Sequence, residues 1–325
     1  MIVYLLRRVL QAAIVLVSMS LLVFLAVYVI GNPVDVLIDP QAPQAEAQRA
    51  AATLGLDRPL HEQYSRFVTG ALNGDLGRSF VANAPALGLV LERLPATLEL
   101  AVAATLLALL IGLPAGLLAG RRPHASTSRA LMGGALLGFS LPTFWVGVLL
   151  VSVFSVGLGW LPPAGRGETV TVLGIPVSLV TRDGLAHAVL PALNLALFQL
   201  ALTLRLVATS ARTAYASEYV RFARARGASE ARIALRHVLP NIAIPVLTVT
   251  GLEFGTLVAF AIVTETIFAW PGMGKLLIDS INLLDRPVIV AYLLVVVLLF
   301  VTVNLLLDLA YAAIDPRVRL HGGRS

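Results

Sequence analysis

The chain has no cysteine and few charged residues. The absence of cysteine excludes disulfide bonds, thiolate metal sites and cysteine nucleophiles. Only 13% of the 325 residues are charged, whereas a soluble domain normally carries about a quarter. Hydrophobic residues make up 58% of the chain. Because so few charges cannot keep such a chain in solution, lipid must cover much of its surface, and we expect an integral membrane protein.

Motifs for nucleotide binding and for covalent chemistry are also missing. The only Gly-Lys pair, Gly274-Lys275, is followed by Leu276, and Ala269 stands where a phosphate-binding loop needs its first glycine, so the chain is not expected to bind ATP. Ser140 could suit an intramembrane nucleophile, but all five histidines lie outside the apolar runs or at their edges. No His-Glu-x-x-His or other metal-ligand spacing occurs. We therefore expect no catalytic residue and no cofactor or metal bound by this chain.

Long apolar runs are abundant. A transmembrane helix needs about 20 predominantly apolar residues. Six runs reach that length: 9–30, 98–119, 131–158, 185–209, 242–268 and 288–312. The fourth is the least apolar, because Asn194, Gln199 and Arg205 interrupt it. The sequence predicts an all-α membrane protein of about six transmembrane helices.

The runs divide the chain into four parts. Residues 1–31 resemble a signal peptide, with Arg7 and Arg8 before an apolar run, but the run is too long and we expect an uncleaved first helix. Residues 32–97 form a loop region with a short amphipathic stretch at 60–72. Residues 98–312 form the transmembrane core, and 313–325 a tail.

Basic residues are distributed unevenly between the two ends of the apolar runs. Fifteen of the 24 Lys and Arg residues fall on the side that holds both termini. Because short loops rich in Lys and Arg remain in the cytoplasm, both termini are expected to be cytoplasmic and residues 32–97 extracytoplasmic. The net charge of +6 is the excess of 24 basic over 18 acidic residues, and no basic groove with interleaved aromatic residues suggests a nucleic-acid partner.

The cytoplasmic segment 211–241 is the most informative part of the sequence. Gly227 suits the left-handed position after a helix end, so a short helix is expected to end there. Ser229 can cap a second short helix, with Glu230 in its first turn. Pro240 is expected to break or redirect that second helix. The sequence predicts two helices that meet at a glycine corner.

Arginines line this segment at helical spacing. Arg221 and Arg224 share one face, as do Arg232 and Arg236. One interpretation is a basic loop held against anionic lipid headgroups. A plain connection needs only about 2–8 residues, however, so a folded elbow that docks a partner is the preferred hypothesis.

The segment resembles the signature loop of ABC importer permeases. That loop reads Glu-Ala-Ala, three residues, Gly, nine residues, Ile-x-Leu-Pro, and the matching positions here are Ala223, Gly227, Leu239 and Pro240. Three positions depart from it: Arg221, Phe222 and His237. With these departures the segment resembles the dipeptide/oligopeptide/nickel branch of the family. In that branch the pattern Tyr-Val-Arg-x-Ala-Arg-Ala-Lys-Gly is usual, and residues 219–227 fit that pattern closely.

Further stretches in the same order resemble the first, B-type permease subunit of that branch. They are Leu54-Gly-Leu-Asp-Arg-Pro-Leu60, Gly74-Asp-Leu-Gly77, Leu94-Pro-Ala-Thr-Leu98, Ser140-Leu-Pro-Thr-Phe-Trp145, Gly159-Trp-Leu-Pro162, Glu265-Thr-Ile-Phe-Ala-Trp-Pro-Gly-Met-Gly274, Asp308-Leu-Ala-Tyr311 and Asp315-Pro-Arg317. The resemblance covers nearly the whole chain.

The resemblance implies a type I ABC importer permease in the plasma (inner) membrane. Such a subunit moves peptides into the cytoplasm, or alternatively a nickel chelate, glutathione or an opine. The implied partners are a homologous second permease, two cytoplasmic ATPases that carry ATP and Mg, and an extracytoplasmic binding protein. The implied coupling residues are Tyr219, Arg221, Ala223, Arg224, Gly227, Leu239 and Pro240. A secondary transporter or channel is the alternative of another class, but the inverted halves with broken helices that would indicate it are not seen.

Three acidic residues lie in or near apolar runs. Glu253 and Asp308 lie deepest, and Glu265 lies near the outer end of the fifth run. A charge at bilayer depth is costly unless it meets water or a partner. These residues could line the pathway or bind the amino end of a peptide, or they could make hydrogen bonds between helices.

Small residues and tryptophans are expected to organise the helices. Gly112, Gly116 and Gly120 repeat every four residues, as do Gly251 and Gly255, which predicts close helix approach. The tryptophans are expected to anchor the membrane interface: Trp145, Trp160 and Trp270.

Overall fold

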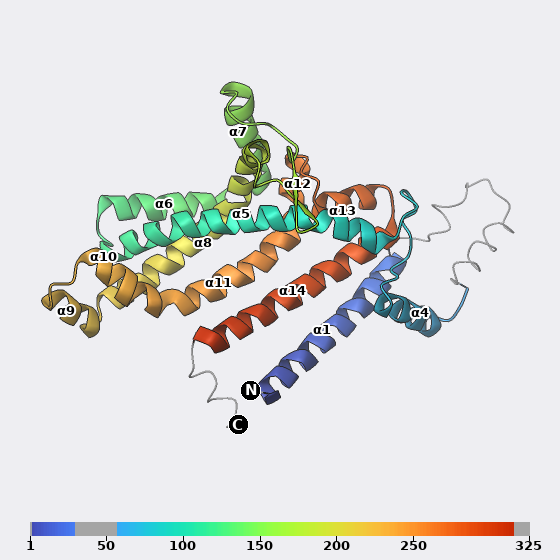
Figure 1. The fold of residues 1–325 in the computed structure, drawn as a ribbon, viewed down its shortest axis with the longest axis horizontal. Coiled ribbons are helices and arrows are strands. Elements are labelled where there is room, and N and C mark those ends of the chain that lie inside the picture. The colour runs from blue at the N-terminus through green and yellow to red at the C-terminus, as the bar shows by residue number, and fades with distance from the viewer. Residues whose placement is uncertain (1, 30–56, 315–325) are drawn as a thin grey trace. The chain divides into compact units, whose positions relative to one another are not determined.

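The computed structural model describes residues 2–29 and 57–314, and this part of the chain is almost entirely helical (Figure 1). It divides into two compact units, residues 1–94 with 272–302, and residues 95–271 with 303–325. Helices α5 (Ala86–Arg121) and α14 (Arg286–Ile314) each run from one unit into the other. The predicted all-α membrane fold is confirmed.

The first unit is built on α1 (Ile2–Val29), α4 (Leu60–Leu72) and α13 (Met273–Asn282). The amphipathic stretch predicted at 60–72 is α4, and it packs on α1 through Phe24, which contacts Tyr64 and Phe67. The Asp285 carboxylate, just before α14, accepts hydrogen bonds from the Ser79 hydroxyl and the Phe80 amide. These contacts fix the segment before α5 to the start of α14.

The second unit holds the remaining elements. They are α6 (Ser126–Ser140), α7 (Thr143–Leu150), the π-helical η1 (Val151–Gly157), β1 (Val170–Val172), β2 (Ile175–Val177), α8 (Arg182–Tyr215), α9 (Glu218–Ala225), α10 (Glu230–Ile233), the π-helical η2 (Ala234–Val238), α11 (Leu239–Phe260) and α12 (Ile262–Ile267). Within it, α8 packs against both α6 and α11. The β1–β2 hairpin was not predicted from the sequence.

Four described helices are long and apolar enough to cross a bilayer. They are Ala86–Arg121, Arg182–Tyr215, Glu230–Phe260 and Arg286–Leu307, and a bent pair, Ser126–Ser140 with Thr143–Gly157, would make a fifth. The first predicted span lies on α1, where the apolar stretch of the described residues covers Ala13–Ala26. The fourth run, with its polar interruptions, is the continuous helix α8. Asn194 and Gln199 are buried and donate to Thr264 and to the Thr250 carbonyl, whereas Arg205 is exposed.

The prediction of one uninterrupted helix at 131–158 is wrong, since the bent pair α6 and α7 covers this run. The chain bends by 105° between α6 and α7. Pro142 has no N–H to donate to the helix, and its ring disfavours helical backbone at Leu141, which is extended with φ −83° and ψ 133°. Pro142 was the sequence signal for this bend, and it was overlooked because it lies within a long apolar run.

The prediction that Pro240 breaks or redirects its helix is also wrong. Residues 230–260 form one continuous helical span, and Pro240 lies in the first turn of α11. The preceding residues form the π-helical turn η2, which already shifts the hydrogen-bond register where the missing proline N–H would matter. The fifth span instead ends at Phe260, and α12 follows as a separate short helix.

The predicted glycine face of α5 lies against α8. A Cβ added at Gly116 would stand 2.6 Å from the Val207 Cβ, and one at Gly120 would stand 2.6 Å from the Ala208 carbonyl oxygen. The two backbones therefore approach too closely for a larger residue. This confirms close packing, which in a membrane depends on small residues rather than on a hydrophobic drive.

One of the three tryptophans does not have the predicted environment. Trp145 and Trp160 are exposed, in agreement with a place at the membrane interface. Trp270 is fully buried, and its Nε1 donates to the Ala96 carbonyl at 2.9 Å. Because its polar atom is satisfied inside the protein, Trp270 can fill the core instead of anchoring to lipid.

Candidate functional site

The elbow, residues 216–238, joins α8 to α11 and contains the glycine corner predicted from the sequence. Gly227 has φ +79°, a left-handed value. Its N–H donates to the Arg224 carbonyl, and the N–H of Ala228 donates to the Ala223 carbonyl. These two bonds form the Schellman motif that ends α9, and they satisfy carbonyls that would otherwise be orphaned.

The second half of the elbow begins at the predicted cap. The Ser229 side chain accepts a hydrogen bond from the Arg232 amide, which starts α10. Helix α10 passes without a break into η2 and then into α11. The elbow is therefore a rigid extension of a long helix, and α9 is the part that turns back on it.

A shared apolar core joins the elbow to the long helices. Val220 and Ala223 of α9, with Ile233 of α10, pack on buried residues of α8 and α11. Further buried members of the cluster are Val207, Ala211, Ala214, Val238, Ile242 and Val246. Leu109, Leu113 and Leu117 of α5 pack on the same cluster. A displacement of α9 must therefore move three long helices with it, since a packed core does not deform continuously.

Glu230 ties the elbow together electrostatically. Its carboxylate accepts from Arg224 Nε at 2.8 Å and lies 3.2 Å from Arg121 Nε at the end of α5. The hydrogen bond to Glu230, and then its negative charge, raise the pKa of the Arg224 guanidinium. Sequence reasoning placed Glu230 only as a favourable first-turn acid, because its partners could not be identified without the fold.

The outer face of the elbow carries exposed apolar and basic side chains. Phe222 and Leu235 are 62% and 63% exposed, and Tyr219 is also exposed. Arg226 lies over the Phe222 ring, with 4.7 Å between Cζ and the ring centroid. Arg221 is exposed and pairs with Glu218, which is exposed as well. Such a mixture of aromatic and arginine side chains is typical of protein–protein contact surfaces.

The structure separates the predicted coupling residues into two groups. Ala223 is buried, Leu239 packs on the elbow core and Arg224 is held by Glu230, so these three shape the elbow. Tyr219, Arg221 and Gly227 are exposed on the elbow, and Pro240 is exposed in the first turn of α11. The segment predicted at 211–241 is shorter in the structure, since α8 continues to Tyr215 and α11 begins at Leu239.

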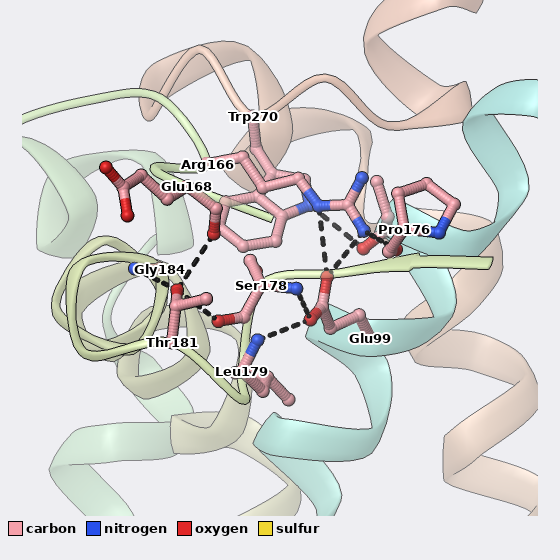
Figure 2. A network of polar contacts seen from close by, with 10 residues as sticks. Glu99, Arg166, Glu168, Pro176, Ser178, Leu179, Thr181, Gly184 and Trp270 are labelled. Atoms are coloured by element: carbon pink, nitrogen blue, oxygen red, sulfur yellow. Dashed lines mark hydrogen bonds and ion pairs between the residues drawn. The ribbon is translucent and has the colours of Figure 1, made fainter. Parts of the chain in front are cut away.

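A second polar network lies at the opposite end of α8 (Figure 2). Arg166 donates from Nε and Nη2 to Oε2 of Glu99, at 3.0 and 2.7 Å. Oε1 of Glu99 accepts from the amides of Ser178 and Leu179 at 2.6 and 2.7 Å. Arg166 Nη2 also donates to the Pro176 carbonyl at 2.7 Å. The Glu99 and Arg166 side chains are 6% and 11% exposed, so this is a nearly buried ion pair with charge-assisted hydrogen bonds.

Comparison with known proteins identifies the family. Residues 112–320 match the family described as "Binding-protein-dependent transport system inner membrane component", and residues 1–101 match its N-terminal region. The chain belongs to this family of inner membrane components. Its match spans more than half of the chain and includes the whole elbow.

Curated relatives of this inner membrane component are similar over nearly their full length. The dipeptide transport system permease protein DppB of Escherichia coli (strain K12) is 36% identical over 334 residues, which cover 97% of this chain and 98% of DppB. The glutathione transport system permease protein GsiC of Escherichia coli (strain K12) is 37% identical over 317 residues, with the same coverage. These relatives show that the inner membrane component is a multi-pass transport subunit.

A solved structure supports the fold. A chain from the MetNI methionine ABC transporter in an inward-facing conformation superposes with a TM-score of 0.53 and 17% identity, covering 71% of this inner membrane component and 98% of that chain. At this identity the similarity concerns the fold alone. It shows the type I ABC importer permease fold.

The three predicted pathway acids of the inner membrane component differ in environment. Glu265 is fully buried and accepts a hydrogen bond from the Thr97 hydroxyl at 2.6 Å, which fits a bond between helices. Glu253 is half-buried in α11, and its Oε2 is buried without a hydrogen-bond partner among the described residues. Asp308 lies on α14, but its side chain is outside the described part of the structure. Glu253 is thus the acid with unmet bonding capacity.

Proposed function

We propose that this chain is the permease subunit of an ATP-driven importer that moves peptides into the cytoplasm. The observation that carries the proposal is the elbow, whose exposed aromatic and arginine surface is packed through one core onto three long helices. The names of the relatives, a dipeptide and a glutathione permease, support a peptide-like solute. Glutathione is itself a tripeptide, so both names point to one chemical class.

The proposed machine needs components that this chain lacks. A homologous second permease would complete the pathway, and two cytoplasmic ATPases, which carry ATP and Mg, would dock on the two elbows. An extracytoplasmic binding protein would deliver the solute. The asymmetry of Lys and Arg supports placing both termini and the elbow in the cytoplasm, with the chain in the plasma (inner) membrane.

The proposed coupling is mechanical. Closure of the ATPases displaces α9, and the apolar core conveys that displacement to α5, α8 and α11. Glu230 of α10 binds Arg224 of α9 and pairs with Arg121 of α5, so this one carboxylate links the three helices. For ATP to drive the cycle, the ATPases must bind the elbow differently in the inward-open and outward-open states.

The first test of the proposed coupling replaces Gly227 at the glycine corner. In vesicles reconstituted with the complete transporter, Gly227→Val is expected to lower ATP-dependent uptake of a radiolabelled dipeptide about tenfold, because a left-handed backbone costs a non-glycine residue roughly 1–2 kcal/mol. A Cβ at Gly227 meets nothing within 4 Å, so the effect comes from the backbone alone.

Gly227→Asn is the matched control, since asparagine tolerates the left-handed conformation. It is expected to retain most of the uptake. Normal ATP-dependent uptake by Gly227→Val, or uptake by the wild type that follows an ion gradient instead of ATP, would contradict the proposed function.

Glu253 is the proposed contact for the cationic amino end of the peptide. Its unmet carboxylate oxygen is available for such a partner. Glu253→Gln is expected to raise the half-saturating peptide concentration about tenfold, because it removes a charge-assisted hydrogen bond worth about 1.5–3 kcal/mol. Glu253→Asp keeps the charge and is expected to lie closer to the wild type. Unchanged uptake kinetics for Glu253→Gln would exclude this residue from the pathway.

A further inference from the structure

Helix α8 exposes a polar face over the last part of its length. Phe198, Arg205, Thr209 and Arg212 are exposed. At about 100° per residue, these four positions fall within about 40° of one line along the helix. Two arginines and a threonine therefore share one face of a helix that is long and apolar enough to cross a bilayer.

Toward the start of α8, other helices of the same unit cover this face. Pro191 and Asn194 continue the same line along the helix, and both are buried. Asn194 donates to the Thr264 hydroxyl of α12 at 2.9 Å, and a Cβ added at Gly147 of α7 would stand 3.4 Å from the Asn194 Nδ2. The face is therefore closed by α7 and α12 in its first half and opens from Phe198 onward.

The depth of Arg205 follows from the packing of α5 on α8. Added Cβ atoms on the α5 glycines would stand 3.1 Å from the Thr203 Cγ2 and 2.6 Å from the Val207 Cβ. Arg205 thus lies at the level of residues 112–116, inside the apolar run of α5. Arg121, at the basic end of α5, is about 10 Å further along at about 1.5 Å per residue. The Arg205 backbone is therefore at the depth of the acyl chains.

A guanidinium at this depth needs water or an anion. Arg205 has no ion-pair partner among the side chains that the structure describes. Acyl chains offer no hydrogen-bond partner, and they suit instead an apolar surface such as the exposed Leu118 of α5. An open face with two arginines and a threonine fits a water-filled passage.

We propose that this face lines the cytoplasmic half of the solute pathway and that Arg205 binds the carboxylate end of the passing peptide. The inference rests on the proposed function, which supplies a zwitterionic solute and places the end of α8 at the cytoplasmic elbow. Every peptide with a free C-terminus carries this carboxylate, whatever its side chains. The planar guanidinium matches a carboxylate through two parallel hydrogen bonds.

The spacing of Arg205 and Glu253 along the helix axes fits a short peptide. Gln199 Nε2 donates to the Thr250 carbonyl at 3.4 Å, so these two residues mark one level of the antiparallel helices α8 and α11. Arg205 lies six residues from that level, and Glu253 lies three residues from it in the opposite direction. The nine residues correspond to about 14 Å. An extended peptide of about four residues has this length, and the two side chains let shorter ones reach both ends.

Labelling from the cytoplasmic side tests whether water fills the face. Because the chain has no cysteine, Thr209→Cys introduces a single thiol there. In inside-out vesicles with the nucleotide-free transporter, a charged methanethiosulfonate is expected to modify it, as measured by the mass of this chain. Relative to free cysteine in solution, the anionic reagent is expected to be favoured over the cationic one about tenfold, because the arginines concentrate anions. Leu118→Cys, at the same depth on the apolar face of α5, is the matched control and is expected to stay unmodified.

Protection by peptide tests the carboxylate contact without the binding protein. Excess dipeptide on the cytoplasmic side is expected to slow the modification of Thr209→Cys. The same dipeptide with an amidated C-terminus is expected to need about a tenfold higher concentration, because it lacks the charged acceptor. Arg205→Gln in the same background is expected to abolish the difference between the two peptides.

Uptake measures the consequence for transport. Arg205→Gln is expected to lower ATP-dependent uptake of a radiolabelled dipeptide about tenfold, since it removes a charge-assisted hydrogen bond. Arg205→Lys keeps the charge and is expected to lie closer to the wild type. Arg129→Gln removes an exposed arginine of α6 and is expected to import like the wild type.

Three results would overturn the inference and leave the proposed function standing. They are equal modification of Thr209→Cys and Leu118→Cys, equal protection by the dipeptide and its amide, and an Arg205→Gln defect that disappears in vesicles without anionic lipid. The last would assign the guanidinium to a lipid phosphate. A wild type without ATP-dependent uptake would overturn the proposed function itself, and the pathway with it.

Discussion

Replacing Glu99 with alanine is expected to lower the free energy of unfolding by about 3–5 kcal/mol, the usual effect of removing one partner from a buried ion pair. Arg166 would remain almost buried without its carboxylate, and the amides of Ser178 and Leu179 would lose their acceptor. Reversible unfolding of the purified protein in mixed micelles, followed by tryptophan fluorescence, measures the change.

Two variants sharpen this experiment. Glu99→Gln keeps an acceptor oxygen but no charge, and an intermediate loss of stability is expected. Glu168→Ala removes an exposed acid from the same loop, and its effect is expected to stay within about 0.5 kcal/mol. Equal stability of Glu99→Ala and Glu168→Ala would show that the network does not hold the loop on α5.

The second large effect is expected at Gly116. Any side chain there meets Val207 at 2.6 Å and the Leu204 carbonyl at 2.9 Å, so Gly116→Leu must separate α5 from α8. Gly116→Ala is expected to cost about 1–3 kcal/mol as an overpacked site, and Gly116→Leu to abolish the folded protein. Size-exclusion chromatography of a fluorescent fusion in mild detergent reports both outcomes.

The matched control for this change lies on α6. A Cβ at Gly133 meets nothing within 4 Å, and an alanine there is expected to stabilise the helix by about 1 kcal/mol. A Gly116→Ala variant combined with Val207→Ala is expected to recover part of the lost stability. The smaller side chain at position 207 leaves room for the methyl group added at position 116. Folded, monodisperse Gly116→Leu protein would refute the close contact between the two helices.

Most of the backbone structure of the elbow could be predicted from local signals in the sequence. Gly227 and Ser229 act on their own turns, through a left-handed backbone and a side-chain cap, so their effects follow from a few neighbouring residues. The predicted coupling role of these positions came from the resemblance to the permease loop. Arg224 binds Glu230, a pair that the sequence did not predict because the two residues come together only once both halves of the elbow are placed. The contact of Arg224 with a partner stays a prediction.

The features that the sequence did not predict depend on contacts between residues that lie far apart in the chain. Glu99 and Arg166 lie 67 residues apart, and no local pattern links a carboxylate near the start of an apolar run with an arginine in a loop. Trp270 was expected at the interface because its acceptor, the Ala96 carbonyl, is unknown without the fold. The bend at Pro142 was passed over because hydropathy counts apolar residues and takes no account of a missing backbone donor.

The π-helical turn η2 sets the direction in which α9 faces. A π turn holds one residue more than an α-helical turn of the same height, so every residue on its far side is rotated by about 100° relative to a regular helix. The rotation of the elbow about the axis of α11 is therefore fixed by a single residue of length. Loss or gain of one residue between Ala234 and Val238 would leave the composition of the elbow and of α11 intact and yet aim them in different directions.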